Sequence, residues 1–252
     1  MNAITATAPS TLRLYVHEAR FEALRLLRTR SFVLPTLLFP LMFYLLFGVL
    51  LNHGNAEAKR YLMASYSVFG VMGPGLFGFG VSLALDRERG LLTLKRALPV
   101  PPGAPLAARM LMAMGFALCV GVLLLIAGTV LGGVQVTPAQ VAALLTVDVL
   151  GVLPFCALGL LVGALVGGSG APAVVNMIYL PMSLLSGLWL PLSMLPDFFG
   201  KLAPLWPAWH LGQLALGVMW QEAGGAVLVH VGVLAAFMAV CFALARRRLR
   251  RA

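Results

Sequence analysis

Residues 110–131 read MLMAMGFALCVGVLLLIAGTVL, an apolar run without a charged side chain. An α-helix rises about 1.5 Å per residue, so a run of this length crosses the ~30 Å hydrocarbon core of a bilayer, where lipid offers no partners to exposed backbone groups. Five further runs of similar character surround it. The six predicted transmembrane helices cover residues 32–51, 62–85, 110–131, 141–166, 171–189 and 226–245.

The composition of the whole chain agrees with this interpretation. Of its 252 residues, 61% are hydrophobic and 10% are charged, and the mean hydropathy of +0.96 lies outside the range of soluble domains. Strands of a membrane β-barrel would alternate apolar and polar positions over about ten residues, and the apolar runs lack that pattern. We therefore predict an all-α integral membrane protein with one transmembrane domain over residues 1–252.

Basic residues are distributed unevenly between the loops. Five precede the first predicted span, five lie between the second and third, and five follow the last, whereas three of the 18 lie in the alternate loops. Because Lys and Arg concentrate on the cytoplasmic side, this pattern predicts that both termini are cytoplasmic. This bias, with attraction to anionic lipids, explains the net charge of +10, which therefore gives no reason to expect nucleic-acid binding.

Two segments outside the spans have their own signatures. Within a cytoplasmic tail over residues 1–30, apolar and charged positions recur at helical spacing, which predicts an amphipathic helix on the membrane surface. Residues 190–225 are apolar but broken by Pro191, Pro196, Pro204 and Pro207. A single crossing is excluded there, so we expect short re-entrant or interfacial helices on the outer side.

Inside the spans, one acid and one row of glycines stand out. Asp148 lies deep in a predicted span, where an ionised carboxylate costs about 2.5–3.5 kcal/mol. We expect it to be protonated, to form a hydrogen bond between helices, to line a polar pathway or to lie near the outer interface. Gly159, Gly163 and Gly167 form a tandem small-xxx-small pattern, which favours close helix packing within one chain or between two copies.

Residues 86–109 read DRERGLLTLKRALPVPPGAPLAAR and interrupt the apolar pattern with mixed charge. A loop needed only for orientation would not require the acids Asp86 and Glu88. Gly90 can end the preceding helix, and four prolines favour a stiff, extended return to the membrane. We predict a short helix held rigidly beneath the bilayer, where a partner can push on the spans.

This loop resembles the first cytoplasmic loop of the type-2 ABC exporter permeases, with a Glu-Arg-Gly step at 88–90, a Lys-Arg step at 95–96, a Pro-rich turn and Arg109 opening the third span. Residues 186–217, SGLWLPLSMLPDFFGKLAPLWPAWHLGQLALG, resemble the second hallmark of that family, which ends in Pro-x-x-His before the last span. With the amphipathic start and the six spans, the resemblance covers nearly the whole chain.

The resemblance implies the permease subunit of an ATP-binding cassette exporter in a bacterial inner membrane. In that family two permeases pair, and each docks a cytoplasmic ATPase through a coupling helix, here within residues 86–109. The implied docking residues are Asp86, Arg87, Glu88, Arg89, Gly90, Lys95 and Arg96. The chain has no GxxxxGK[ST] phosphate loop. ATP and Mg would therefore bind to the partner ATPase, and the chain itself would not be an enzyme.

The resemblance also implies a hydrophobic or amphipathic substrate, such as a drug, a lipid or a lipid-linked glycan. The outer segment that contains Trp206, Trp209 and His210 would shape the exit of this substrate. Asp148 is a further candidate for the translocation path.

Two alternatives remain open. A haem-exporter permease would use outward histidines, for which His53 and His210 are the candidates. A carrier driven by an ion gradient would use Asp148 as its proton or cation site, although such carriers usually have more buried ionisable groups or an inverted repeat. Catalysis is not expected, because Ser169 has no His and Asp at a supporting spacing.

Overall fold

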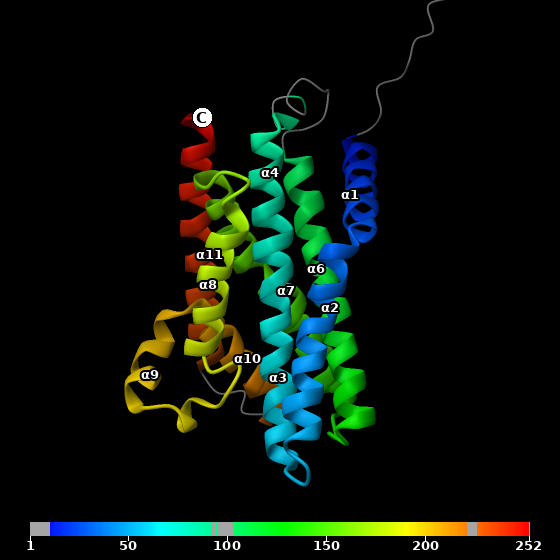
Figure 1. Ribbon diagram of the computed structural model, residues 1–252, viewed down its shortest axis with the longest axis vertical. Coiled ribbons are helices and arrows are strands. Elements are labelled where there is room, and N and C mark those ends of the chain that lie inside the picture. Colours follow the sequence, from blue (N-terminus) through cyan, green and yellow to red (C-terminus); the bar gives the residue numbers. More distant parts are fainter. Residues whose placement is uncertain (1–10, 92–93, 95–102, 221–225, 252) are drawn as a thin grey trace, which may run out of the picture.

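The computed structural model describes residues 11–91, 94, 103–220 and 226–251, and within these ranges the chain forms helices joined by turns, without a strand. The long helices run along one axis of the molecule (Figure 1). The predicted all-α fold class is therefore confirmed. The described elements are α1 (Thr11–Arg28), α2 (Arg30–Phe43), η1 (Tyr44–Leu50), α3 (Ala56–Gly73), η2 (Pro74–Val81), α4 (Ser82–Glu88), α6 (Ala104–Ile126), η3 (Ala127–Leu131), α7 (Pro138–Leu165), α8 (Ala171–Leu185), η4 (Leu192–Met194), α9 (Asp197–Leu202), η5 (Ala203–Leu205), α10 (Pro207–Trp220) and α11 (Ala226–Arg251).

Five helical stretches are long and apolar enough to cross a membrane: Arg30–Leu50, Ala56–Glu88, Ala104–Leu131, Pro138–Leu165 and Val227–Leu249. They correspond to five of the six predicted spans. The remaining span, predicted over residues 171–189, contains α8, whose 15 residues reach only ~22 Å, short of a ~30 Å hydrocarbon core. Gly187, at φ +74°, follows the end of this helix. The six-span count stays a prediction.

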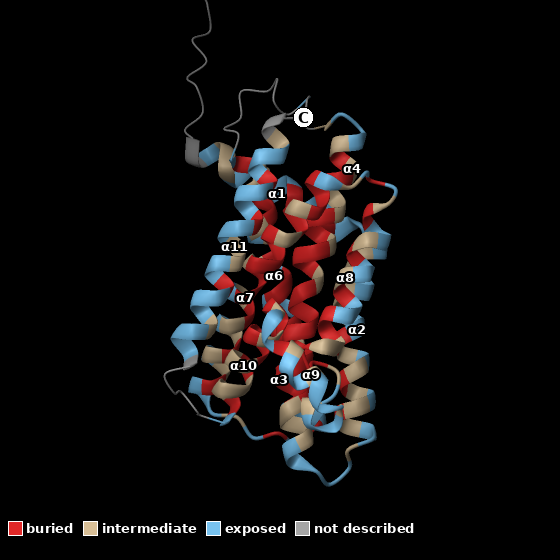
Figure 2. Ribbon diagram, turned by 90° about the vertical axis from the view of Figure 1, so that its left-hand side faces the viewer, coloured by how far each residue is buried: buried red, intermediate tan, exposed pale blue. Residues whose placement is uncertain are grey.

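The continuous helix built from α3, η2 and α4 is the most deeply buried of the five stretches, and the buried residues gather in the middle of the bundle (Figure 2). Its π-helical section begins at Pro74, which lacks the backbone donor of a regular α-helix. This section packs against α7. The second span is therefore longer than predicted, and it carries Asp86 and Glu88 in its last turn.

Glycines on both helices allow η2 and α7 to approach closely. A Cβ atom added to Gly159 would lie 2.5 Å from the Gly75 carbonyl oxygen, and one added to Gly163 would lie 2.6 Å from that of Gly80. This contact lies within one chain. Gly167, the third member of the predicted row, follows α7 and would be 4.0 Å from the Glu88 carboxylate, so it does not share the close contact.

The prolines after α8 interrupt the helical structure at the predicted positions. Pro191 precedes η4, Pro196 precedes α9, Pro204 lies in η5 and Pro207 begins α10. A pyrrolidine ring is tolerated at a helix start, where the missing N–H has no intrahelical acceptor. The segment therefore turns repeatedly instead of crossing the bundle.

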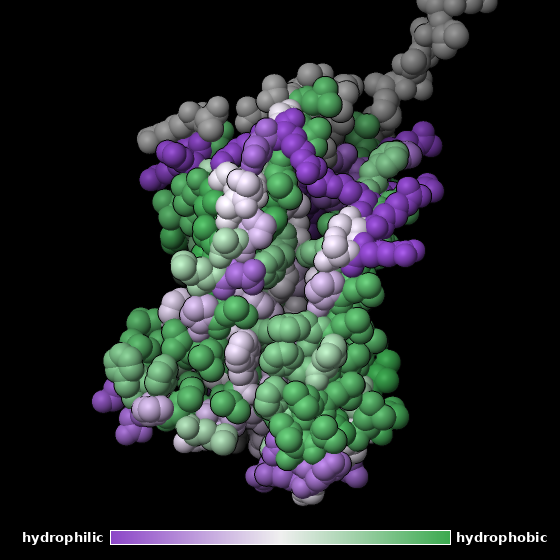
Figure 3. Space-filling view, viewed as in Figure 1, coloured by the Kyte–Doolittle hydropathy of each residue, from purple (hydrophilic) through white to green (hydrophobic). Residues whose placement is uncertain are grey.

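The two ends of the bundle differ in the side chains they carry. One end, which we call the charged end, contains Glu22, Arg25, Asp86 and Arg109. It is formed by α1, the end of α4, the start of α6 and the end of α11 (Figure 1). The opposite end, which we call the aromatic end, holds α9, α10 and the tryptophans of residues 206–220. A belt of hydrophobic surface separates them (Figure 3).

Candidate functional site

Four charged side chains from three helices meet at the charged end. Glu22 and Arg25 come from α1, Asp86 from the last turn of α4, and Arg109 from near the start of α6. Arg25 donates from its two terminal nitrogens to the two carboxylate oxygens of Asp86, each at 3.0 Å. Arg109 donates from Nε to Glu22 at 3.2 Å and from Nη2 to Asp86. This ion cluster joins α1, α4 and α6.

Most of the ion cluster is shielded from solvent. Asp86, Arg109 and Glu22 are 1%, 3% and 4% exposed, and such charges are stable only when paired and hydrogen-bonded. Arg25 is partly exposed. Burial lowers the pKa of Arg25, but its hydrogen bond to Asp86 and the charges of Glu22 and Asp86 raise the pKa, and the net shift is upward. Arg25 therefore remains a cation.

The ion cluster places two side chains inside the bundle. Asp86 is buried there because two arginines neutralise its carboxylate, and its part in ATPase docking stays a prediction. The N-terminal helix was predicted to lie on the membrane surface. In the structure α1 packs against α6, Glu22 points inward, and Phe21 and Leu27 are 66% and 57% exposed. The acid of α1 is stabilised by Arg109 instead of by solvent.

The next two side chains tie α4 to the turn between α7 and α8. Arg87 donates to the carbonyl of Ala164 and, at 2.9 Å, to that of Val166. Carbonyls at the C-terminal end of a helix have no intrahelical donor, and a cation is favourable there. Glu88 accepts a hydrogen bond from the backbone N–H of Ser169 at 3.2 Å. The end of α4 is thus attached to α7 and to the turn that precedes α8, as well as to α1 and α6.

After these contacts the chain leaves the bundle. Glu88, Arg89 and Gly90 are exposed, and Gly90 follows the helix with φ +72°, a conformation that favours glycine. Lys95 and Arg96, the other two predicted docking residues, lie outside the described residues. Of the predicted docking set, the structure therefore presents residues 88–90 on the surface.

Asp148 lies in the core between α3, α6 and α7, fully buried. Its Oδ1 is 3.0 Å from Ser67 Oγ, which is also 2.9 Å from the Ala64 carbonyl oxygen. Because the hydroxyl has one hydrogen, both contacts are hydrogen bonds only if Asp148 is protonated and donates to Ser67. A neutral carboxyl also fits a site where the described residues provide no cation.

At the aromatic end, two histidines face each other. His210 of α10 is buried, and its Nδ1 lies 2.8 Å from Nδ1 of His230 in α11, while its Nε2 lies 2.9 Å from the Pro204 carbonyl oxygen. The Trp209 ring meets both imidazoles edge to face. Trp206 begins the same turn and accepts a hydrogen bond from the Trp209 backbone N–H. The structure thus brings Trp209 and His210 together, whereas Asp148 lies apart from them in the core.

Some side chains of these sites were not found from the sequence. Glu22, Arg25 and Arg109, the other members of the ion cluster, were not singled out as site residues. An acid at the membrane edge, such as Asp86, indicates that a cation must lie near it. His230 was missed within an apolar span. A histidine within a transmembrane span indicates that a polar partner lies near, because its ring needs hydrogen-bond partners.

These features define a multi-pass membrane protein whose helices are tied together at one charged end. A family model described as "ABC-2 type transporter" matches residues 17–220. This is most of the chain, so the chain belongs to the ABC-2 type transporter family. It is the membrane permease subunit of an ABC transporter, as the resemblance implied, and membership implies that it works with an ABC ATPase subunit instead of being an enzyme itself.

Two relatives are similar to this chain. One, named "Putative transport permease YvfS", from Bacillus subtilis (strain 168), is 28% identical over 235 residues, which is 91% of this chain and 94% of the relative. The other, named "Nodulation protein J", from Sinorhizobium fredii (strain NBRC 101917 / NGR234), is 36% identical over 98 residues, covering 38% of this chain and 37% of the relative. The first relative therefore aligns over almost its whole length.

Proposed function

We propose that this chain is the permease of an ABC exporter, which moves a hydrophobic or amphipathic molecule, such as a drug, a lipid or a lipid-linked glycan, out of the cytoplasm or the inner leaflet. Two copies pair in a bacterial inner membrane, with both termini and the charged end in the cytoplasm, as the placement of basic residues favours. Each copy binds one cytoplasmic ATPase, and that ATPase holds ATP and Mg.

The observation that carries this proposal is the set of contacts at the end of α4. Asp86 is bound to α1 and α6, while Arg87 and Glu88 hold the α7–α8 turn. A push on the exposed residues 88–90 is therefore passed directly to α1, α6, α7 and the turn that precedes α8. ATP-driven closure of two ATPase subunits can then favour a second arrangement of the spans, provided that the contacts differ between the two states.

The contacts give less support to the two alternatives. Both ring nitrogens of His210 already have partners, so this side chain would have to rotate before it could bind haem iron. Asp148 has Ser67 as its partner and does not line the four cavities of about 760, 280, 210 and 190 Å³. A proton or cation carrier would need a route to that carboxyl.

The docking step is tested by the double variant Glu88→Ala and Arg89→Ala, coexpressed with the cognate ATPase. We expect the amount of ATPase that copurifies to fall about tenfold or more, because truncating an important interface residue costs more than about 1 kcal/mol of binding free energy. The matched control is Glu57→Ala with Lys59→Ala, at the start of α3 on the opposite end. Unchanged copurification and unchanged transport in the first variant would contradict the proposal.

A further inference from the structure

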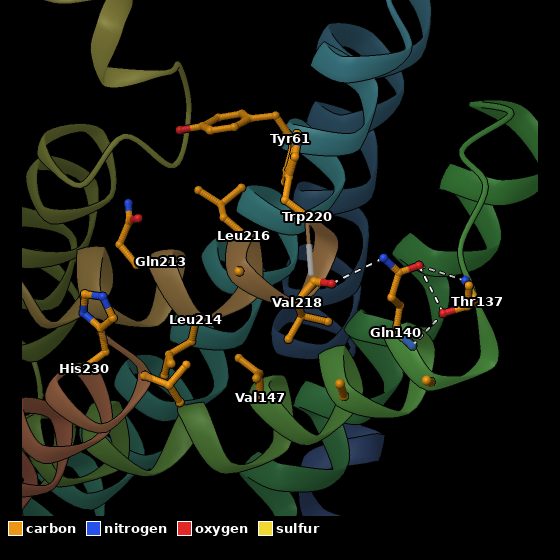
Figure 4. A pocket seen from close by; sticks show the side chains of 14 residues that line it. Tyr61, Thr137, Gln140, Val147, Gln213, Leu214, Leu216, Val218, Trp220 and His230 are labelled. Carbon is orange, nitrogen blue, oxygen red and sulfur yellow. Dashed lines mark hydrogen bonds between the residues drawn. The ribbon is translucent and has the colours of Figure 1, made fainter. Parts of the chain in front are cut away.

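Three hollows follow one another along the contact between α7 and α11. The first, of about 760 Å³, lies at the aromatic end between α3, α7, α10 and α11 (Figure 4). The second, of about 280 Å³, shares the wall residues Val147, Leu214 and Val227 with it. The third, of about 190 Å³, shares Leu153 and Met238 with the second. The three hollows are therefore neighbours along α7 and α11, and we call them together the α7–α11 groove.

The groove lies among helices that are long enough to span a membrane. Along α7 it runs from Gln140 in the first hollow to Leu153 in the second, which is ~20 Å of helix. A bilayer with its headgroups is about 40–45 Å thick, so one leaflet has a similar depth. A lipid molecule standing in its own leaflet therefore matches the first two hollows in length.

The polarity of the groove changes along its length. The wall of the first hollow includes the polar side chains of Tyr61, Gln213 and His230, on different helices. The second hollow has Thr146 as its polar residue, and this hydroxyl donates to the Ala142 carbonyl of its own helix at 2.8 Å. The third hollow is apolar except for Cys156. A molecule with one polar end and a long apolar end has this pattern.

The histidine pair determines what the polar end of the groove offers. The Pro204 carbonyl can only accept, so His210 carries its hydrogen on Nε2, and the Nδ1 of a neutral His210 accepts from His230. The hydrogen of His230 is then on Nδ1. Its Nε2 is left as a hydrogen-bond acceptor without a partner in the described chain, on the wall of the first hollow.

Gln213 adds a second unpaired group on the same side of the hollow (Figure 4). Its amide has no hydrogen-bond partner among the described residues, and its position is one turn after His210 on α10. Tyr61 donates its hydroxyl hydrogen to the Gly187 carbonyl at 2.8 Å, so it has no hydrogen left to donate into the hollow. Among the described residues no charged side chain lines the hollow, and the nearby Arg60 already donates to the Met219 carbonyl and lies over the Trp220 ring. The described wall therefore offers a phosphate or an ammonium group no free counter-charge.

We propose that the α7–α11 groove binds one membrane lipid with an uncharged, hydroxyl-bearing headgroup. The hydroxyl groups donate to His230 Nε2 and bind the Gln213 amide, and an acyl chain lies along α7 and α11. This site goes beyond the proposed function, because it needs neither the ATPase nor transport. It adds a lipid-binding site within one chain, whose polar end lies away from the charged end.

The test uses the purified protein in nanodiscs of phosphatidylcholine, whose headgroup lacks hydrogen-bond donors. The probe is a diacylglycerol with one glucose as headgroup and a photoreactive diazirine in one acyl chain, and the comparison probe is phosphatidylcholine with the same chain. After illumination, mass spectrometry measures labelling of peptides from residues 146–154 and 231–238. We expect the glucosyl probe to label them about three- to tenfold more, the effect of one or two hydrogen bonds.

Two variants test the headgroup contacts separately. Gln213→Leu removes the amide with little change in volume. His230→Asn keeps a donor near the position of Nδ1, and so the contact with His210, but removes Nε2. Each should bring the labelling ratio close to one, while Asn176→Leu, on an exposed part of α8, should leave it unchanged. If His230→Asn lowers the unfolding midpoint, Gln213→Leu alone decides the result.

Two outcomes would overturn the proposal. Equal labelling by the two probes in the unmodified protein means that ordinary surrounding lipid enters the groove without recognition. Absence of labelling at these peptides by either probe means that something else covers the groove, such as a second copy of the chain. Neither outcome bears on ATPase docking, so a failure here and a failure of the proposed function are distinguishable.

Discussion

The two ends of the bundle hold their helices together by different interactions. At the charged end, two acids and two arginines form an ion cluster in which three of the four side chains are buried. At the aromatic end, the described residues form no ion pair between elements: Arg60 of α3 donates to the Met219 carbonyl and lies over the Trp220 ring, and the other contacts use neutral groups or the backbone. Gln140 donates to the Met219 carbonyl at 2.9 Å, and Tyr61 donates to that of Gly187 at 2.8 Å.

This difference bears on how each end can move. Removing one member of a buried ion cluster leaves a charge without a partner, so the helices at the charged end separate only at a large cost. A neutral hydrogen bond contributes about 0.5–1.5 kcal/mol and can be exchanged for another. We infer that the charged end moves as one unit under the ATPase, whereas the aromatic end can repack around a passing or bound molecule.

The largest expected effect follows from removing Arg109. In Arg109→Met, Glu22 loses its buried partner and Asp86 keeps only Arg25, which is partly exposed. Breaking a buried ion cluster in this way costs about 3–5 kcal/mol. We expect a marked fall in the unfolding midpoint of the purified protein in detergent, and weaker attachment of α1 measured by hydrogen exchange.

The matched control is Arg25→Gln. This arginine is partly exposed, so its loss should lower the midpoint much less than the loss of Arg109. If the two variants have equal midpoints, close to that of the unmodified protein, the charged end is not held by its ions, and the contrast between the two ends disappears.

The fold class could be predicted from the sequence because membrane insertion depends on local hydrophobicity. The proline breaks after α8 were predictable for the same reason, since the missing N–H acts at the residue itself. The length of α8 was not. The apolar run continues to residue 189, but the helix ends at Leu185 before Gly187, and hydropathy alone does not reveal this end.

The ion cluster could not be predicted, although every member of it is visible in the sequence. Asp86 and Arg25 are 61 positions apart, and Arg109 and Glu22 are 87 apart. Helical spacing reveals which side chains share a face, but not which face of α1 meets α6. The pairing depends on tertiary packing, and this is why Asp86 was assigned to the cytoplasmic coupling loop.

An intermediate effect is expected at the contact between η2 and α7, which lies between the two ends. A Cβ on Gly159 would be 2.5 Å from the Gly75 carbonyl oxygen and 3.1 Å from the Gly80 nitrogen, both backbone atoms that cannot rotate away. Gly159→Ala should therefore destabilise the protein by about 1–3 kcal/mol through overpacking, seen as a lower unfolding midpoint.

Gly115→Ala in α6 is the control, because a Cβ there meets no atom within 4 Å. Alanine is the better helix former, so this variant should be as stable as the unmodified protein or more stable by up to about 1 kcal/mol. Effects of the same size and sign at both glycines would show that the close packing of η2 on α7 has no special role in joining the two ends.

The smallest effect is expected at Asp148. If this side chain were ionised, the core would hold an unpaired buried charge, unlike either end of the bundle. In Asp148→Asn, the side-chain amide can donate to Ser67 as the protonated acid does. Stability should change by less than about 1 kcal/mol, and ATP-dependent transport should persist. The infrared carbonyl stretch of a protonated carboxyl should be present in the unmodified protein at neutral pH and absent from the variant.

If transport is lost while the midpoint is retained, and the stretch is missing from the unmodified protein, then Asp148 is an ionised carboxylate. The carrier alternative would then explain this residue better, and the core would have to be grouped with the charged end.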